Sequence, residues 1–143
     1  MNIDKFKHQH VSILRRIAAL RELTHAGVAR NAEAIAQGIV AMSSVIKLHL
    51  SVEDQALYPA LQRGEDAELA RLGQRFQVEM GPIAAAFDQF ARRWNTAQRL
   101  REDEAAFRAA ANDVLRRVHE RMRHEDRDFY PRVEAQHAEA AAC

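Results

Sequence analysis

Apolar residues recur along the chain at intervals of three and four positions, which is the periodicity of one face of an α-helix. Four long segments carry such an apolar stripe, and short polar stretches separate them. Long amphipathic helices with short links favour an antiparallel up-down-up-down four-helix bundle, and 143 residues suffice for one domain, 1–143. The pattern therefore predicts an all-α fold with helices at about 4–24, 31–63, 66–95 and 103–138.

Helix-breaking residues suggest where these helices end. Gly27 is expected to end the first helix, and Asn31 is a good N-cap residue for the second. Pro59 marks a kink or an end of the second helix, and a polar link is expected at about 95–103. Pro82 lies within the third helix, where it predicts either a kink or a break into two shorter helices.

Polar side chains interrupt the apolar stripe of every predicted helix. An unpaired buried carboxylate costs several kcal/mol, so such groups are usually paired, neutralised or bound to a metal. Imidazole and carboxylate groups suit iron, manganese or zinc, and His49 and Glu53 have the i, i+4 spacing that places both within reach of one ion. The stripes therefore predict a metal site inside the bundle. Its candidate ligands are His10, His49, Glu53, Glu79 and Glu125.

A short motif occurs twice in the chain. EDQALYP at 53–59 returns as EDRDFYP at 125–131, each time near the end of a predicted helix. The repeat indicates either two related helical hairpins or two helices that merely end alike. Tyr58 and Tyr130 in these motifs are each either a packed aromatic residue or a phenol that reaches the metal.

These residues resemble the hemerythrin-like, or HHE cation-binding, domain family. The resemblance rests on HLSVED at 49–54, on His10 followed by Ile13, and on the two motifs that end in Tyr-Pro, and it covers nearly the whole chain. It implies a non-haem di-iron centre inside a four-helix bundle, which binds oxygen reversibly or senses oxygen or iron. It also implies that His10, His49 and Glu53 are ligands and that Glu53 and Glu125 bridge the irons.

Two features depart from the family pattern. Residues 65–96 contain no histidine, although the third helix of the family contributes one or two, and Glu79 is the expected replacement. Arg121 stands where the family has a histidine; because a guanidinium has no lone pair, it is expected to hydrogen-bond a bridging carboxylate or bound oxygen species. His119 and His124 flank the core stripe, so each either faces solvent or, if the helix bulges, binds metal. The resemblance favours His124.

Charge and composition exclude several other classes. The 21 Lys and Arg residues nearly balance 20 Asp and Glu, which gives no reason to expect nucleic acid or an anionic membrane as a partner. No run is apolar and long enough to serve as a signal or to span a bilayer, so a cytoplasmic protein is expected. The one cysteine, Cys143, excludes an internal disulfide and is given no role. A surface position is expected for His8, His25 and His137.

Three functions follow from these features. The first is a non-haem di-iron protein that binds or senses oxygen, peroxide, nitric oxide or iron, and that is an enzyme only if it turns over peroxide or iron. The second is a metal-free or zinc-stabilised helical interaction module whose metal site has decayed. The third is a structural bundle that self-associates through an exposed apolar face around Phe90 and Trp94. The sequence leaves open whether one metal or two bind and whether the protein is a monomer or a homodimer.

Overall fold

The computed structural model describes residues 2–142, and their side chains as far as residue 136. Within residues 2–142 the chain contains helices joined by short links and no strand, so the prediction of an all-α chain is confirmed. Cys143 and the side chain of His137 lie outside the described part. The helices, with η denoting a π-helix, are α1 (Asp4–Ala26), α2 (Ala32–Val52), η1 (Glu53–Leu57), α3 (Tyr58–Arg63), α4 (Ala67–Trp94), α5 (Ala97–Glu102), α6 (Glu104–His124), η2 (Glu125–Phe129) and α7 (Tyr130–Ala142).

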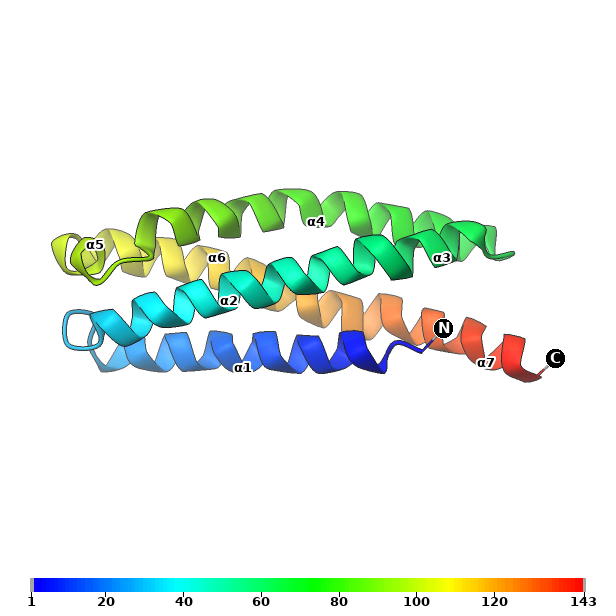
Figure 1. Ribbon diagram of the computed structural model, residues 1–143, viewed down its shortest axis with the longest axis horizontal. Coiled ribbons are helices and arrows are strands. Elements are labelled where there is room, and N and C mark those ends of the chain that lie inside the picture. The colour runs from blue at the N-terminus through cyan, green and yellow to red at the C-terminus, as the bar shows by residue number, and fades with distance from the viewer. Residues whose placement is uncertain (1, 143) are drawn as a thin grey trace.

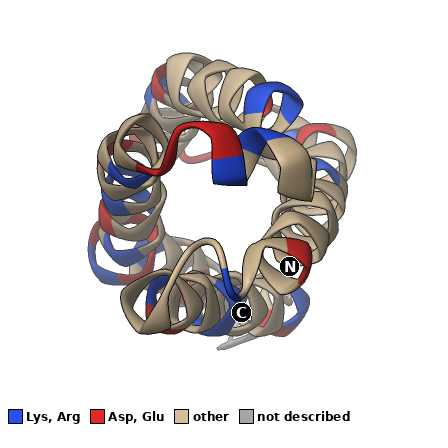
Figure 2. Ribbon diagram, turned by 90° about the vertical axis from the view of Figure 1, so that its left-hand side faces the viewer, with Lys and Arg blue, Asp and Glu red and all other residues tan. Residues whose placement is uncertain are grey.

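The helices are arranged in four columns. The first column is α1, the second is α2 with η1 and α3, the third is α4, and the fourth is α6 with η2 and α7. Successive columns run in opposite directions along the long axis of the molecule (Figure 1). Contacts join α1 to α2, α2 to α4, α4 to α6 and α6 back to α1, so the columns surround a common interior (Figure 2). Side chains from all four columns can therefore meet there.

The turn between α1 and α2 follows the predicted signals. Gly27 ends α1 with a φ of 141°, a conformation that favours glycine. Asn31 precedes α2 as expected, but its side chain does not cap that helix. Its Nδ2 donates instead to the carbonyl oxygens of Leu23 at 3.3 Å and of Gly27 at 2.9 Å. Asn31 thus ties the end of α1 to the start of α2.

Two expectations about helix breaks are corrected by the structure. The link predicted at 95–103 contains the helix α5, which begins after Thr96 and places the side chain of Leu100 wholly in the core. Pro82 lies inside α4, and this helix continues from Ala67 to Trp94, so the alternative of a break there is wrong.

The repeated motif forms a π-helix in both places. The N–H of Tyr58 donates to the carbonyl of Glu53, and the N–H of Tyr130 donates to the carbonyl of Glu125, five residues earlier in each case. A proline follows each of these tyrosines. The proline ring clashes with the carbonyl four residues before it in an α-helix, and the wider π turn accommodates it. Pro59 therefore does not end its helix, and the second column continues to Arg63.

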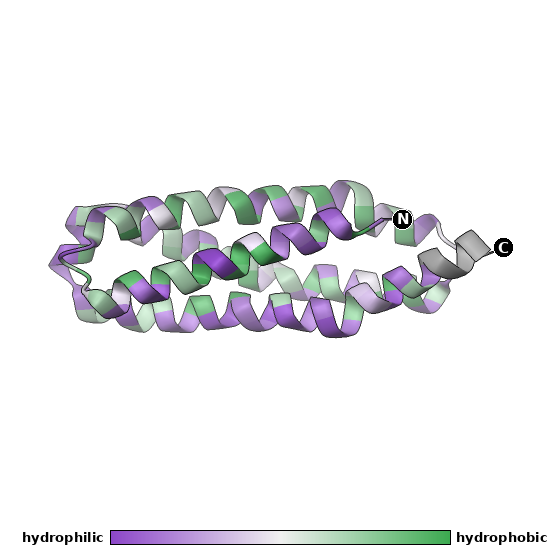
Figure 3. Cartoon of the chain, turned by 90° about the horizontal axis from the view of Figure 1, so that it is seen from below, coloured by the Kyte–Doolittle hydropathy of each residue, from purple (hydrophilic) through white to green (hydrophobic). Residues whose placement is uncertain are grey.

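Buried apolar side chains form two clusters along the axis, while hydrophobic and hydrophilic positions alternate around each column (Figure 3). At the start of the chain the smaller cluster contains Ile3, which precedes α1, and Phe6 of α1, and the larger cluster starts at Ile13. Buried polar residues lie between the two clusters, in what we call the polar layer. Its members are His10, His49, Glu53, Arg121 and Glu125.

Phe90 and Trp94 belong to the larger cluster. Only 6% of Phe90 and 3% of Trp94 is exposed, because both rings pack against Phe107. The expectation of an exposed apolar face around these two residues is therefore wrong, and the third function loses its contact surface.

One stretch, Ala32–Arg63, is long and apolar enough to cross a membrane, contrary to the expectation that none would be. This is weak evidence for a membrane protein, because the core helix of a soluble protein passes the same test. Here the stretch also carries His49 and Glu53, which are buried in the polar layer. The cytoplasmic location stays a prediction.

Candidate metal centre

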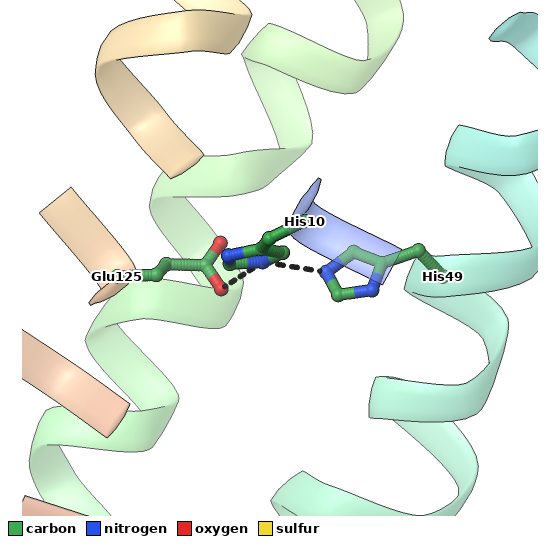
Figure 4. Close-up of side chains that lie close together, drawn as sticks. All are labelled: His10, His49 and Glu125. Atoms are coloured by element: carbon green, nitrogen blue, oxygen red, sulfur yellow. Dashed lines mark hydrogen bonds and ion pairs between the residues drawn. The ribbon is translucent and has the colours of Figure 1, made fainter. Parts of the chain in front are cut away.

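Four polar-layer side chains lie close together, three of them, His10, His49 and Glu125, with ligand atoms within 4.8 Å of one another. His10 comes from α1, His49 from α2, and Glu53 and Glu125 from the first positions of η1 and η2. Nε2 of His10 lies 3.0 Å from Nε2 of His49 and 3.5 Å from Oε2 of Glu125 (Figure 4). Nε2 of His49 lies 3.1 Å from Oε1 of Glu53. All four residues are at most 1% exposed, as their core stripes predicted. Their role as metal ligands stays a prediction.

The outer nitrogen of each histidine is held by an oxygen. Nδ1 of His10 lies 2.8 Å from Oδ1 of Asp126, and Nδ1 of His49 lies 2.6 Å from Oε1 of Gln9. Because these oxygens accept hydrogen bonds, each Nδ1 carries a proton, and the Nε2 atom of a neutral ring presents a lone pair to the centre. Two lone pairs only 3.0 Å apart repel each other unless a proton or a metal ion lies between them. Metal-binding histidines usually have this outer hydrogen bond.

Each glutamate has one oxygen bound by the protein and one that faces the centre. Oε2 of Glu53 accepts a hydrogen bond from Tyr130 at 2.9 Å, and Oε1 of Glu125 accepts one from Arg121 at 3.0 Å. The other oxygens, Oε1 of Glu53 and Oε2 of Glu125, are buried and lack a hydrogen-bond partner among the described residues. Each lies near an imidazole nitrogen without hydrogen-bond geometry. Leaving such an oxygen unpaired costs about 1–3 kcal/mol, which a bound cation would offset.

The charges of the centre shift the pKa values of its members. Burial alone would lower the pKa of His10, but the carboxylates of Asp126 and Glu125 raise this pKa to about 9. Burial alone would raise the pKa of Glu125, but His10 and Arg121 lower it to about 2. Burial raises the pKa of Glu53 even though His49 opposes the shift. Without a metal, a proton on His10 thus supplies the positive charge at the centre, and metal binding would displace it.

Tyr130 reaches the centre. Its hydroxyl lies 2.9 Å from Oε2 of Glu53 and 3.0 Å from Nε2 of His10, and the residue is fully buried. Of the two alternatives for Tyr130, the phenol that reaches the site is the one the structure supports. Tyr58 instead stacks on Phe129, with 6.2 Å between the ring centroids, and is a packed aromatic residue.

A family model, the hemerythrin HHE cation binding domain, matches residues 1–133. The chain belongs to this hemerythrin family. The domain binds metal cations, typically iron. Neither a curated protein nor a solved structure matches the chain.

Two predicted ligands of this hemerythrin-like domain lie at its surface. The side chain of Glu79 is 52% exposed and that of His124 is 46% exposed. The prediction that Glu79 lies on the core face is wrong, because Phe76 and Met80 take the inward positions of α4. The fourth column does contain a bulge, the π-helix η2. This π-helix begins at Glu125, after both His119 and His124, so it turns neither histidine inward. His8 and His25 are exposed, as predicted.

Arg121 is held firmly at the edge of the centre and is only 4% exposed. Its Nε donates to Oε1 of Glu125, which confirms the expectation that it hydrogen-bonds a carboxylate. Its Nη2 donates to the carbonyl of Phe76, and the guanidinium carbon lies 4.6 Å from the centroid of the Phe76 ring. Its Nη1 lies 3.7 Å from Oε2 of Glu79.

Asp126 and Gln9 orient the two histidines, although no role was predicted for either residue. Asp126 belongs to the repeated Glu-Asp pair, which was a usable signal. Its counterpart Asp54, however, accepts a hydrogen bond from Gln77 at the surface, so the repeat alone does not tell which acid holds a histidine. Gln9 had no signal beyond being next to His10.

The donor atoms of this hemerythrin-like domain fit one cation. One ring nitrogen each of His10 and His49 and one oxygen of Glu125 lie within 4.8 Å of one another, and Oε1 of Glu53 lies 3.1 Å from Nε2 of His49. They do not fit the di-iron centre that the resemblance implies. Tyr130 holds Oε2 of Glu53, and Arg121 places a fixed positive charge at Oε1 of Glu125, where a second ion would have to bind. The third column also offers no imidazole.

Proposed function

We propose that this hemerythrin-like protein binds non-haem iron in its polar layer and through it binds or senses oxygen or a related small molecule, such as peroxide or nitric oxide. The observation that carries the proposal is the pair of buried, unpartnered oxygens of Glu53 and Glu125 beside two imidazole Nε2 atoms. Iron held there would supply a redox-active centre with positions for a small ligand. We also propose that the four columns form the up-down-up-down four-helix bundle of this family.

Each residue of the centre has a distinct part. His10 and His49 bind the cation through Nε2, while Glu53 and Glu125 bind it and balance its charge. Tyr130 holds Glu53 in place by its hydroxyl. Asp126 and Gln9 orient the two imidazoles, as described above.

A cavity lies beside the second column near the centre, although none of its lining residues belongs to the polar layer. This cavity has a volume of about 170 Å³, lies between the second column and α4, and has room for more than one water molecule. It borders Asp54, the residue next to Glu53, and the ring of Tyr58. The size of this cavity favours a ligand of a few atoms.

The test is the metal content of protein expressed with iron, together with optical spectra in air, after anaerobic reduction and after addition of nitric oxide. We expect bound iron and a spectrum that changes with both treatments. Glu53→Gln should lose the iron, whereas Glu79→Gln, a matched change at an exposed glutamate, should keep it. Protein that takes up no iron would refute the proposal.

A zinc-stabilised interaction module is the second candidate. Two imidazoles and two carboxylates also provide the four ligands of a structural zinc site. One tightly held zinc and a spectrum that ignores reduction would favour this candidate. We propose a cytoplasmic monomer or homodimer without a nucleic-acid or membrane partner in either case.

A further inference from the structure

We infer that this domain holds a single metal ion and that the guanidinium of Arg121 takes the place of a second one. The inference rests on the proposed metal site. Its starting point is a correspondence between the two π-helices. His49 precedes Glu53 by four residues at the start of η1, and Arg121 precedes Glu125 by four residues at the start of η2.

The two pairs have the same geometry and opposite chemistry. Nε2 of His49 lies 3.1 Å from Oε1 of Glu53, and Nε of Arg121 lies 3.0 Å from Oε1 of Glu125. The imidazole offers a lone pair to a cation, whereas the guanidinium is itself a cation and stays protonated. A metal on the Arg121 side of Glu125 would therefore meet a fixed positive charge instead of a ligand.

The surroundings of Arg121 keep it in this position. The carbonyl of Phe76 accepts one of its N–H groups and the ring of Phe76 lies against its guanidinium. Oε2 of Glu79 approaches it from the surface at 3.7 Å. Arg121 is thus bound to α4 as well as to Glu125. At this level α4 presents an aromatic ring and a backbone carbonyl, and no side-chain metal ligand that is buried.

The charges of the polar layer also favour one ion. Glu53, Glu125 and Asp126 carry three negative charges when ionised, and Arg121 together with one divalent ion carries three positive charges. A second divalent ion would leave two positive charges uncompensated, although the five members of the polar layer are buried and Asp126 beside them is only partly exposed. Uncompensated charge in such surroundings is strongly unfavourable.

The first experiment counts metal ions in the full-length protein. We expect one iron per chain, and in the oxidised protein the electron paramagnetic resonance signal of an isolated high-spin ferric ion. Two irons per chain with no signal, as for a magnetically coupled ferric pair, would overturn the inference and leave the proposed iron binding intact. Protein that binds no metal would overturn both.

The second experiment tests the charge of Arg121 with cobalt(II) as the probe, by titration of metal-free protein. Arg121→Gln removes a like charge next to the site and frees Oε1 of Glu125, so we expect cobalt to bind at least about tenfold more tightly. Arg121→Lys keeps the charge and should bind cobalt as the unchanged protein does. Arg116→Gln, on the same helix and exposed, is the matched control and should have no effect.

A purely structural role of Arg121 predicts the reverse, because a loosened site binds metal more weakly. Weaker cobalt binding by Arg121→Gln, in a variant whose circular dichroism shows a folded protein, would therefore overturn the assigned charge role. If Arg121→Gln does not fold, the comparison of Arg121→Lys with the unchanged protein decides, since weakened binding there would count against the inference in the same way.

Discussion

Glu125 stands between two positive groups, His10 on one side and Arg121 on the other. Oε2 of Glu125 lies 3.5 Å from Nε2 of His10, and its Oε1 accepts the hydrogen bond of Arg121. These neighbours outweigh burial and hold the pKa of Glu125 at about 2. The carboxylate is therefore ionised over the whole range in which the protein would meet a metal.

Tyr130 provides a prediction at the same scale. Tyr130→Phe leaves Oε2 of Glu53 buried without its donor, so we expect the free energy of unfolding of the metal-free protein to fall by about 1–3 kcal/mol. Urea unfolding measures this change. Tyr58→Phe is the control, because the Tyr58 hydroxyl makes no hydrogen bond to the side chains or backbone described here, and it should cost much less. An equal loss in the two variants would contradict the role given to Tyr130.

The sequence predicted the buried members of the centre better than the residues that support them. His10, His49, Glu53 and Glu125 each interrupt an apolar stripe, and burial of a polar residue is visible in that pattern. Glu79 is next to the inward-facing Met80, and one step along a helix turns a side chain by about 100°. An error of one residue in the predicted buried face therefore assigns a surface side chain to the core. The oxygen that binds each histidine Nδ1 comes from another column. The spacing of residues along one helix therefore cannot predict it.

At the scale of elements, the two π-helices decide which way the columns present their residues. A π turn contains one more residue than the α turn it replaces. All side chains after the turn are therefore rotated about the helix axis by about 100°. In the second column Glu53 faces the interior before the turn, and Leu57, Tyr58 and Leu61 face it afterwards. Leu57 and Leu61 would share the face of Glu53 in an α-helix as well, but Tyr58, five residues after Glu53, would face about 140° away, so the π turn is what allows its burial.

Deletion of Ala56 tests this element. The loss of one exposed residue from η1 should restore an α turn and rotate either Glu53 or the following apolar residues out of the interior. We expect the deletion variant to lose its metal and to unfold at lower urea concentration, with little change in helix content by circular dichroism. Deletion of Glu65, in the exposed link between α3 and α4, is the control. Full metal content after deletion of Ala56 would show that the π turn does not position Glu53.

The elements themselves were largely predictable, and the exceptions have physical causes. The four long helices follow from the apolar periodicity, and Gly27 and Asn31 marked a turn correctly. The helix α5 was missed because Leu100 is its one buried residue, too little to form a stripe. The π turns were missed because proline signals a disturbed helix without telling whether the helix ends or widens.

For the whole molecule, the polar layer lies between two apolar clusters, takes its members from three columns and contacts the fourth, α4, through Arg121. His10, His49 and Glu125 come from α1, α2 and the start of η2, so one ion would connect these columns. A metal ion bound there stabilises the folded chain as a whole, because the unfolded chain does not bring its ligands together.

Removal of the metal tests this connection. Each tenfold excess of free metal over the dissociation constant should add about 1.4 kcal/mol to the free energy of unfolding, so the midpoint of thermal unfolding should rise with metal concentration and fall on chelation. His25→Ala, at an exposed histidine, should show the same dependence as the unchanged protein. His49→Ala should show none. A midpoint of the unchanged protein that does not depend on metal would argue against a site inside the fold.

The second π-helix has a further meaning for protein engineering. The backbone of η2 already aims Glu125 inward as η1 aims Glu53, and the fourth column needs no rebuilding to face the interior. Beside the polar layer, the pair α4 and α6 differs from the pair α1 and α2 chiefly in side chains, namely Arg121 and the inward residues of α4. A designer who wanted a second metal could therefore keep this scaffold and change only its side chains.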